Sequence, residues 1–439
     1  MKQKLQLLTG YVEIFLICGL VYSWAVFDHI LRKEGVYEEL CETTSGGNET
    51  CPAQDKIFLQ VTSAGSLMVS VGGLMYGLVI DRFEIRVTRI LCALCLTSSF
   101  IIYYFLDLSS HLVWPFWILL SSSTLAPLLT TFKLTNNFPK HQMTLLTIGD
   151  GIFDTSVAAT ALWTYFYNNG MSVNFMAMVL IGFMAFFWLN TFLLLPKKNP
   201  KLKEENEQDE IHEEEMFLEE NEPKTPSGLK YFTSKLSIFT NLSTIMFIVS
   251  YVIIDTRLVL TFYVVPTILE NTFEDEEEKL AAGQFFTKAN SLSFVVCWMG
   301  GALADRFHRR KTINFLLIFI ILIQVGVSIL PLFATSWAIK FMSIIFPIGR
   351  TMFYGISSMI LMDRYREDFG FMFGVVNLTA AFVIFFMTNY IASNTEFLDQ
   401  IMLVLGICCG LTVFYPLYEL KQIWRESDEK TKKLESVKN

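Results

Sequence analysis

Seven ionisable side chains interrupt the long apolar runs of this sequence. They are Glu13, Asp150, Asp154, Asp255, Arg257, Lys288 and Arg350. A charge inside such a run costs several kcal/mol unless it faces a water-filled cavity or a partner of opposite charge. Each of the seven is therefore a candidate to bind a polar solute or to form an ion pair between helices.

Asp150 and Asp154 are four residues apart, so a helix presents both on one face. With a rise of 1.5 Å per residue, Asp154 lies roughly 17 Å from the start of its apolar run, near the middle of a bilayer. We expect Asp154 either to line a central cavity or to form a structural ion pair. We expect Asp150 to lie farther from a bound solute.

Two arginines stand inside the second half of the chain. Arg257 carries five donors in a fixed fork, which suits either a carbonyl-bearing heterocycle or a carboxylate. Asp255 is only two residues away and so points to another side of the helix. Arg350 is followed one turn later by Tyr354. Glu13 could pair with either arginine, and the sequence leaves that choice open.

Aromatic side chains add a second kind of candidate. A flat heterocyclic solute stacks on aromatic rings with about 1–3 kcal/mol per contact. The candidates are Trp24, Phe153, Phe262, Tyr263 and Tyr354. Because the chain has 40 Phe, most of its rings must face lipid or pack against helices. Lys288 begins its apolar run, and we expect its ammonium to extend to the outer surface.

The composition indicates what kind of structural element must hold these residues in place. Apolar residues make up 53% of the 439, and charged residues only 17%, against about 25% in soluble proteins. This excludes a disordered chain and argues against a soluble one. Twelve runs are long enough to span a bilayer, which takes about 20 residues. They cover about residues 5–30, 57–80, 88–108, 113–132, 143–166, 173–195, 242–265, 285–304, 313–333, 337–362, 371–391 and 401–417. The expected fold class is an all-α polytopic membrane protein.

The distribution of Lys and Arg predicts the orientation. With the N-terminus in the cytoplasm, the inner segments hold nearly all the basic residues, as the positive-inside rule requires. The loop of about residues 31–56 then lies outside, and we expect a plasma-membrane protein with both termini cytoplasmic. That loop carries the sequon at Asn48, together with Cys41 and Cys51. A glycan and a disulfide both fit an outer loop, although a chance sequon and free thiols are the alternatives.

The hydrophilic stretch of residues 196–237 divides the chain. Residues 1–195 and 238–418 each hold six spans, and residues 419–439 form a cytoplasmic tail. Between residues 204 and 222 lie eleven acids and no Lys or Arg, which predicts a disordered linker, either a plain spacer or a docking segment. Without these acids the formal charge of −8 becomes +3. The overall negative charge gives no reason to expect nucleic acid as a partner.

One motif occurs at the same place in both halves. The end of span two reads Gly77-x-x-x-Asp81-Arg82-Phe83 with Arg86 three residues later, and the end of span eight repeats the pattern from Gly301. The second copy contains Gly301, Asp305, Arg306, Arg309 and Arg310. The duplication resembles the loop motif of the major facilitator superfamily. The resemblance implies two six-helix halves that rock about a central site, with each Asp accepting from a neighbouring helix N-terminus and the Arg residues pairing across the halves.

Further segments resemble solute carrier family 43, over about residues 5–420 without the linker. They are Leu7-Leu8-Thr9-Gly10 with Glu13, Gly19 and Trp24; Lys33-Glu34, Tyr37 and Leu40-Cys41; Ala53-Gln54-Asp55; Asn136, Phe138, His141, Thr144, Thr147, Gly151, Phe153, Asp154 and Ser156; Arg350 with Phe353-Tyr354-Gly355; and Phe369-Gly370 with Phe373-Gly374. The span-five pattern is similar to the equilibrative nucleobase branch, and the sister branches carry large neutral amino acids. Gln142 departs from that pattern, which usually has Arg there.

These features favour a transporter that moves purine nucleobases by facilitated alternating access. From the intramembrane charges and the aromatic candidates, we expect a site formed by Asp154, Arg257, Arg350, Glu13, Tyr354, Phe153 and Trp24. Transport of leucine-like amino acids is the alternative, and a non-transporting membrane sensor is a remote one. We expect no cofactor and no metal, since no phosphate-binding loop, zinc motif or nucleophile elbow occurs. The expected partners are a small solute and the lipid bilayer, and a monomer is plausible.

Overall fold

The computed structural model describes residues 2–41, 51–196, 235–273, 275–292, 294–333, 335–393 and 398–438. Every regular element in these ranges is a helix. The expected glycosylation site at Asn48 and nearly all of the acidic linker lie outside the described residues.

Six spans form the first half of the molecule. Their bounds are α1 Lys2–Ile17 with the short helix Cys18–Ser23 and α2 Trp24–Lys33; α3 Pro52–Arg82; α4 Ile85–Tyr104; α5 Val113–Ser123 with α6 Leu125–Leu134; α7 Gln142–Asn168; and α8 Val173–Leu189, which continues as a π-helical turn over Asn190–Leu194.

Six further spans form the second half. Their bounds are α11 Leu242–Thr272; α12 Glu276–Leu292 with α13 Phe294–Arg306; α14 Arg309–Ile329; α15 Ser336–Arg364; α16 Phe369–Ser393; and α17 Leu398–Leu411 with α18 Phe414–Lys438. Helix α18 carries the last span well into the predicted tail.

The expected twelve-helix fold is confirmed. Ten helical stretches of the described chain are long and apolar enough to cross a membrane, and they coincide with ten of the predicted runs. The remaining two predicted runs correspond to α7 and to the α12–α13 pair, which carry Asp150, Asp154 and Lys288.

Span four is interrupted between α5 and α6 because of Pro127. A proline has no N–H and cannot bond the carbonyl four residues earlier, which is that of Ser123. That carbonyl instead accepts from the Cys92 thiol of α4, with Sγ···O 3.5 Å. The neighbouring carbonyl of Thr124 accepts from the Cys18 thiol of span one at 3.0 Å. The Cys92 thiol thus acts as a structural hydrogen-bond donor.

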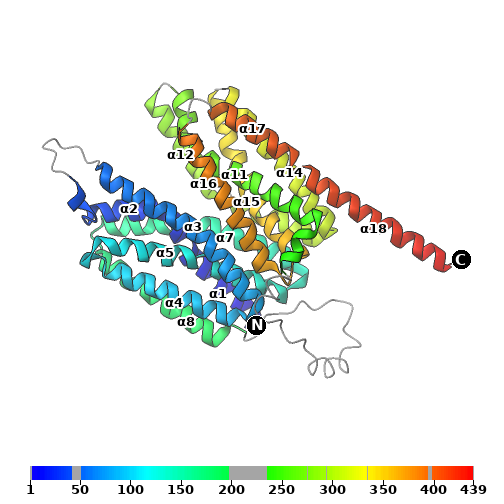
Figure 1. The fold of residues 1–439 in the computed structure, drawn as a ribbon, viewed down its shortest axis with the longest axis horizontal. Helices are drawn as coiled ribbons and strands as arrows, with labels where there is room; N and C mark the ends of the chain where they lie inside the picture. Colours follow the sequence, from blue (N-terminus) through cyan, green and yellow to red (C-terminus); the bar gives the residue numbers. More distant parts are fainter. Residues whose placement is uncertain are drawn as a thin grey trace.

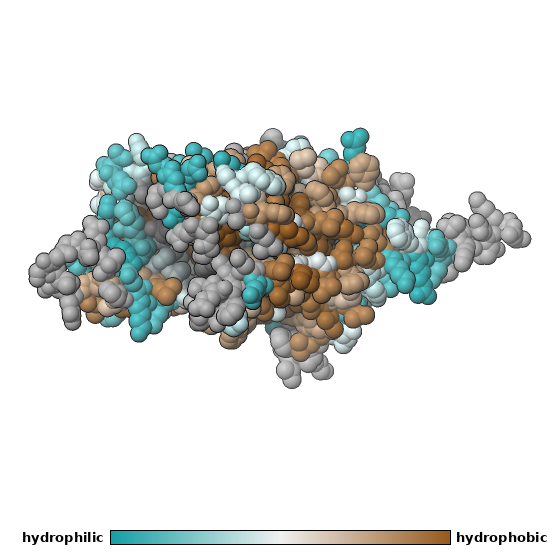
Figure 2. All heavy atoms as spheres, turned by 90° about the horizontal axis from the view of Figure 1, so that it is seen from above, coloured by the Kyte–Doolittle hydropathy of each residue, from teal (hydrophilic) through white to brown (hydrophobic). Residues whose placement is uncertain are grey.

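The two halves lie together at one end of the bundle and diverge toward the other (Figure 1). Contacts between them run along α3 with α16 and along α7 with α13 and α15. Hydrophobic side chains gather over the middle of the face shown in Figure 2, and hydrophilic ones toward its two ends. Large exposed apolar residues such as Phe385 and Phe386 fit a surface that lipid covers.

Candidate functional site

An ion pair joins the halves at the centre of the molecule. Arg350 of α15 approaches Asp154 of α7, with Nη2···Oδ2 3.2 Å, and the side chains remain 19% and 10% exposed. The guanidinium carbon of Arg350 also lies 5.4 Å from the ring centre of Phe262 on α11, a cation–π contact. Asp154 and Arg350 thus form an ion pair between helices, which is the second of the two expectations for Asp154.

Beside this pair, the second half contributes a polar contact of its own. The Tyr354 hydroxyl of α15 donates to Asp255 Oδ1 of α11 at 2.7 Å. Tyr354 follows Arg350 by one turn, so both side chains leave α15 on the same face. The second half therefore places the Arg350 guanidinium and the Tyr354 phenol one turn apart on α15. The Asp255 carboxylate of α11 lies against the phenol.

The first half contributes an aromatic pair that sequence reasoning only partly found. Phe153 of α7 meets Tyr22 edge to face, with ring centres 5.5 Å apart. Tyr22 is 53% exposed and lies within the electrostatic range of Asp154, Asp255 and Arg350. Its span breaks at Cys18–Ser23, where Gly19 lies so close to α7 that an added Cβ would be 2.3 Å from the Ser156 backbone. Gly19 was the sequence signal for this approach.

The expectation that Glu13 belongs to the central site is wrong. Glu13 is buried within the first half, where it forms an ion pair with Arg89 of α4 and accepts from Asn190 Nδ2 at 2.7 Å. Arg89 is fully buried, with its guanidinium carbon 4.4 Å from the Phe187 ring centre.

Arg257 and Trp24 also lie elsewhere. Arg257 points into the second half, where its Nε donates to Ser328 Oγ of α14 at 2.8 Å and its Nη1 donates to Thr261. Trp24 packs against the rings of Phe58 and Trp117 within the first half. Helix rotation turned both side chains away from the centre, and spacing alone did not reveal that rotation.

Two other candidates stay apart from the centre. Lys288 is exposed on α12, in keeping with an ammonium that reaches water. The side chain of Tyr263 lies outside the described residues. The central cluster is therefore Tyr22, Phe153, Asp154, Asp255, Phe262, Arg350 and Tyr354.

The first copy of the loop motif latches the halves together. Asp81 accepts from the backbone N–H groups of Gly370 and Phe371, at 3.1 and 2.6 Å, at the start of α16. Lys133 of α6 lies 3.1 Å from the same carboxylate. Gly77 permits the contact, since a Cβ there would lie 2.0 Å from the Gly370 carbonyl oxygen. We call this end of the bundle the motif end.

The second copy makes the same contact with α7. Asp305 accepts from Met143 N at 3.1 Å, and from Thr144 N and Oγ1 at 2.8 and 2.7 Å. A Cβ on Gly301 would lie 2.4 Å from the Met143 carbonyl oxygen. Each motif Asp thus caps a helix of the opposite half, where the positive end of the helix dipole favours an anion.

The motif arginines follow the expectation only in part. Arg309 crosses to the first half and donates to the Pro139 carbonyl at 3.1 Å. Arg86 stays in its own half and donates to the Leu195 carbonyl at 2.9 Å, and Arg310 lies 3.3 Å from Asp363. Arg82 lies over the Phe83 ring, and Arg306 is exposed. The latch thus depends on the aspartates more than on the arginines.

A further contact lies where the linker enters the second half. Lys235 pairs with Asp368, one residue before α16. Partial burial lowers the pKa of Lys235. Charged side chains from three other segments thus gather at the start of α16, namely Asp81 of α3, Lys133 of α6 and Lys235.

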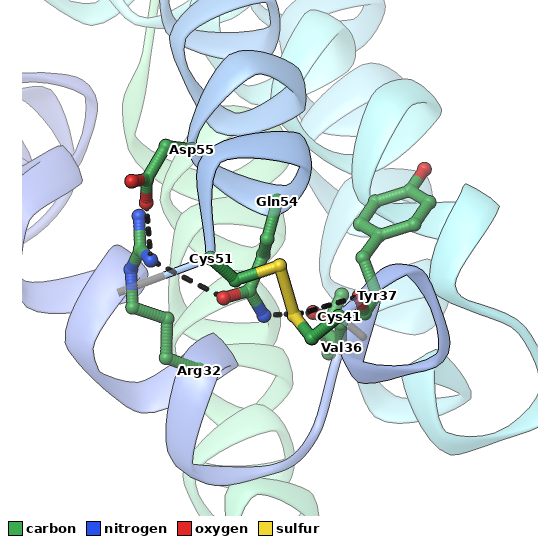
Figure 3. Close-up of a disulfide and its surroundings, with 7 residues drawn as sticks. All are labelled: Arg32, Val36, Tyr37, Cys41, Cys51, Gln54 and Asp55. Carbon is green, nitrogen blue, oxygen red and sulfur yellow. Dashed lines mark hydrogen bonds and ion pairs between the residues drawn. A yellow bond between two sulfur atoms is a disulfide. The ribbon is translucent and has the colours of Figure 1, made fainter. Parts of the chain in front are cut away.

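At the opposite end, Cys41 and Cys51 form a disulfide (Figure 3). Arg32 of α2 lies beside it and donates to Asp55 Oδ1 of α3 at 2.6 Å and to Gln54 Oε1 at 3.2 Å. Gln54 in turn donates to the Val36 carbonyl at 2.7 Å. These contacts fasten the loop between spans one and two to the start of α3.

Known proteins resemble this chain in both sequence and fold. It is 27% identical over 198 residues to the equilibrative nucleobase transporter 1 of Bos taurus, which covers 44% of this chain and 40% of that protein. It is 24% identical over 201 residues to the large neutral amino acids transporter small subunit 3 of Mus musculus, with 43% and 36% covered. The alignments thus span less than half of these relatives.

The fold resembles that of FucP, a major facilitator superfamily transporter solved in the outward conformation. The TM-score is 0.60 at 11% identity, over 93% of this chain and 99% of that one. The model of the Major Facilitator Superfamily matches residues 59–388, well over half of the sequence. With its twelve helices and its duplicated latch, the chain belongs to the Major Facilitator Superfamily.

Proposed function

We propose that this transporter moves purine nucleobases across the membrane by facilitated alternating access. The observation that carries the proposal is the Asp154–Arg350 pair, which joins the two halves, with the Phe262 ring beside Arg350 and the Phe153–Tyr22 ring pair next to Asp154 along α7. A purine offers two flat faces for stacking, and its edge offers both donors and acceptors. The rings of Phe153, Tyr22 and Phe262 suit the faces, while Arg350 donates and Asp154 accepts.

The resemblance to solute carrier family 43 supports this substrate class. The motifs around span five and span ten are similar to the nucleobase branch, and a relative of this chain is named an equilibrative nucleobase transporter. We place the motif end in the cytoplasm, because the Lys and Arg of the loops gather there. The disulfide loop and Asn48 would then face away from the cytoplasm, and we propose a location in the plasma membrane.

The proposed cycle uses the latches as its gate. In the present arrangement Asp81 and Asp305 hold the motif end closed while the halves diverge at the other end (Figure 1). Solute enters from the open end and binds between the halves. Rocking of the halves breaks both caps and opens the motif end, so that the solute leaves on the cytoplasmic side.

Large neutral amino acids are the second candidate. An amino acid needs a cation for its carboxylate and an anion for its ammonium group, and Arg350 with Asp154 or Asp255 meets that need. A relative of this chain is named a large neutral amino acids transporter. Arg350 is already paired with Asp154, however, so a carboxylate would have to displace that partner.

Uptake of labelled adenine and labelled leucine, in cells that express the chain, distinguishes the two. We expect adenine uptake that saturates and falls at least tenfold in Asp154→Asn and Arg350→Lys. Glu429→Gln is the matched control, because it removes a carboxylate from an exposed ion pair with Arg425 far from the centre. Leucine uptake without adenine uptake would establish the second candidate, and uptake of neither would refute both.

A further inference from the structure

Asp150 is the least compensated carboxylate in the described interior. It is 6% exposed. One oxygen, Oδ1, accepts from the Ser358 hydroxyl of α15 at 3.4 Å, which is long for a hydrogen bond. The other oxygen, Oδ2, is buried and has no hydrogen-bond partner. The proposed transport cycle assigns no role to this side chain.

The other buried acids of the bundle have stronger partners. Ion pairs hold five of them, namely Glu13 with Arg89, Asp81 with Lys133, Asp154 with Arg350, Asp305 with Arg309, and Glu419 with Arg364. Asp255 has no recorded ion pair but accepts a short bond from the Tyr354 hydroxyl. Among the described residues, Asp150 is therefore a buried carboxylate that accepts one long hydrogen bond and has one oxygen without a hydrogen-bond partner.

The groups around Asp150 do not supply a positive charge. Its titratable neighbours are Asp154 on its own helix, Tyr11 on α1, Tyr251 on α11 and Cys297 on α13. None of these side chains carries a positive charge in either of its protonation states, and Asp154 is one turn away.

The cationic side chains on neighbouring elements either pair with other carboxylates or are exposed. Arg350 pairs with Asp154, Lys133 with Asp81, and Arg309 with Asp305, while Lys288 of α12 is exposed. A buried carboxylate without a counter-charge costs several kcal/mol, whereas its neutral acid costs far less.

The position of Asp150 links its protonation to the transport cycle. Its one partner, Ser358, belongs to the opposite half, so the contact lies in the seam where α7 meets α13 and α15. Cys297 of α13 crosses the same seam and donates to the Thr147 carbonyl of α7, with Sγ···O 2.9 Å. Opening of the motif end must part this seam and let water reach the carboxyl group.

We propose that Asp150 is a proton-binding site of this transporter. It holds a proton while the seam is closed and gives it to water on the motif side when the seam opens. A proton from water must bind again before the seam can close, since closing over a bare carboxylate would bury an unpaired charge. This step rests on the proposed alternating-access cycle, but the proton-binding property itself does not.

Thermal unfolding of the purified protein tests whether Asp150 binds a proton in the folded state, and it needs no substrate. An Asp in the unfolded chain is ionised above about pH 4, so the folded wild type binds one proton more than the unfolded chain. Wild-type stability must therefore fall with rising pH relative to Asp150→Asn, by about tenfold per pH unit in the unfolding equilibrium. Asp107→Asn, which removes an exposed carboxylate, should show no such trend. A constant difference between wild type and Asp150→Asn from pH 5.5 to 8.5 would overturn the proposal.

Adenine transport into proteoliposomes, with equal pH on both sides, tests the role in the cycle. The maximal rate of the wild type should fall as pH rises, by up to about tenfold per unit where Asp150 titrates. Asp150→Asn should transport with a flat pH profile, and Asp107→Asn should follow the wild type. Identical profiles in wild type and Asp150→Asn would overturn the proposed release step. Absence of adenine transport in the wild type refutes the proposed substrate instead, and the unfolding experiment still decides on the proton.

Discussion

The latch at the motif end makes a quantitative prediction for Asp81→Asn. The side chain of Asp81 is fully buried, and its carboxylate accepts two backbone N–H groups of α16 while facing Lys133 at 3.1 Å. An amide keeps one acceptor oxygen but loses the charge, and its NH2 must face a donor. Breaking a buried charge pair costs about 3–5 kcal/mol. At the lower end, about 3 kcal/mol, the ratio of closed to open molecules falls roughly 150-fold.

A native cysteine reports that shift. The Cys297 thiol is 1% exposed and lies in the seam, where it donates to the carbonyl of Thr147 in the other half. Opening of the motif end exposes it, so its labelling by a water-soluble maleimide should accelerate by up to the same factor. Cys92, equally buried within the first half, is the internal control, because only unfolding exposes both thiols. Peptide mapping by mass spectrometry measures the two rates in one sample.

The reasoning would be refuted by a Cys297 labelling rate within twofold of the wild type in a folded Asp81→Asn protein. Asp305→Asn provides an independent copy of the test. Its carboxylate caps α7 as that of Asp81 caps α16, so it should accelerate Cys297 labelling in the same direction. Acceleration in one variant alone would show that the two latches are not equivalent.

Three further predictions concern residues away from the latch. Glu13→Gln should lower the thermal stability, by about 3–5 kcal/mol, because it leaves Arg89 buried without a counter-charge; thermal unfolding measures this, while the KM of the remaining transport should not change. Arg350→Lys should raise the KM for adenine at least tenfold with normal surface expression, since a lysine cannot reproduce the planar fork; an unchanged KM would remove Arg350 from the binding site. Reduction of the Cys41–Cys51 disulfide, which closes a short loop, should cost about 2–3 kcal/mol of stability and leave the KM unchanged, as calorimetry and uptake would show.

Much of the architecture was predictable from local features of the sequence. Apolar runs of sufficient length mark the twelve spans, because a helix must satisfy its own backbone in lipid. The repeated Gly-x-x-x-Asp-Arg-Phe motif indicated the superfamily fold and predicted that each motif Asp caps a neighbouring helix, while the structure showed that these helices are α16 and α7. Pro127 lies at the interruption of span four, but a proline alone does not determine such a break, because α15 continues through Pro347.

The partners of the intramembrane charges were harder to predict. Glu13 was assigned a choice between Arg257 and Arg350, yet it pairs with Arg89, which the sequence places at the edge of a span. Arg257 turned toward Ser328 of α14 and Tyr22 toward the centre, although neither has a distinctive sequence context. The Asp154–Arg350 ion pair and the Tyr354–Asp255 hydrogen bond each joined two residues that had been singled out independently.

The sequence by itself determined the number of spans, the duplicated halves and the residues that must avoid lipid. Those properties depend on side-chain polarity and on the rise of a helix, which act within one segment. The tertiary structure decided which charge meets which, because that depends on how each helix is rotated and which helix lies beside it. Asp150 illustrates the difference. The sequence placed it on the same helix face as Asp154, but only the packing of α7 against α15 left one carboxylate paired and the other without a cation.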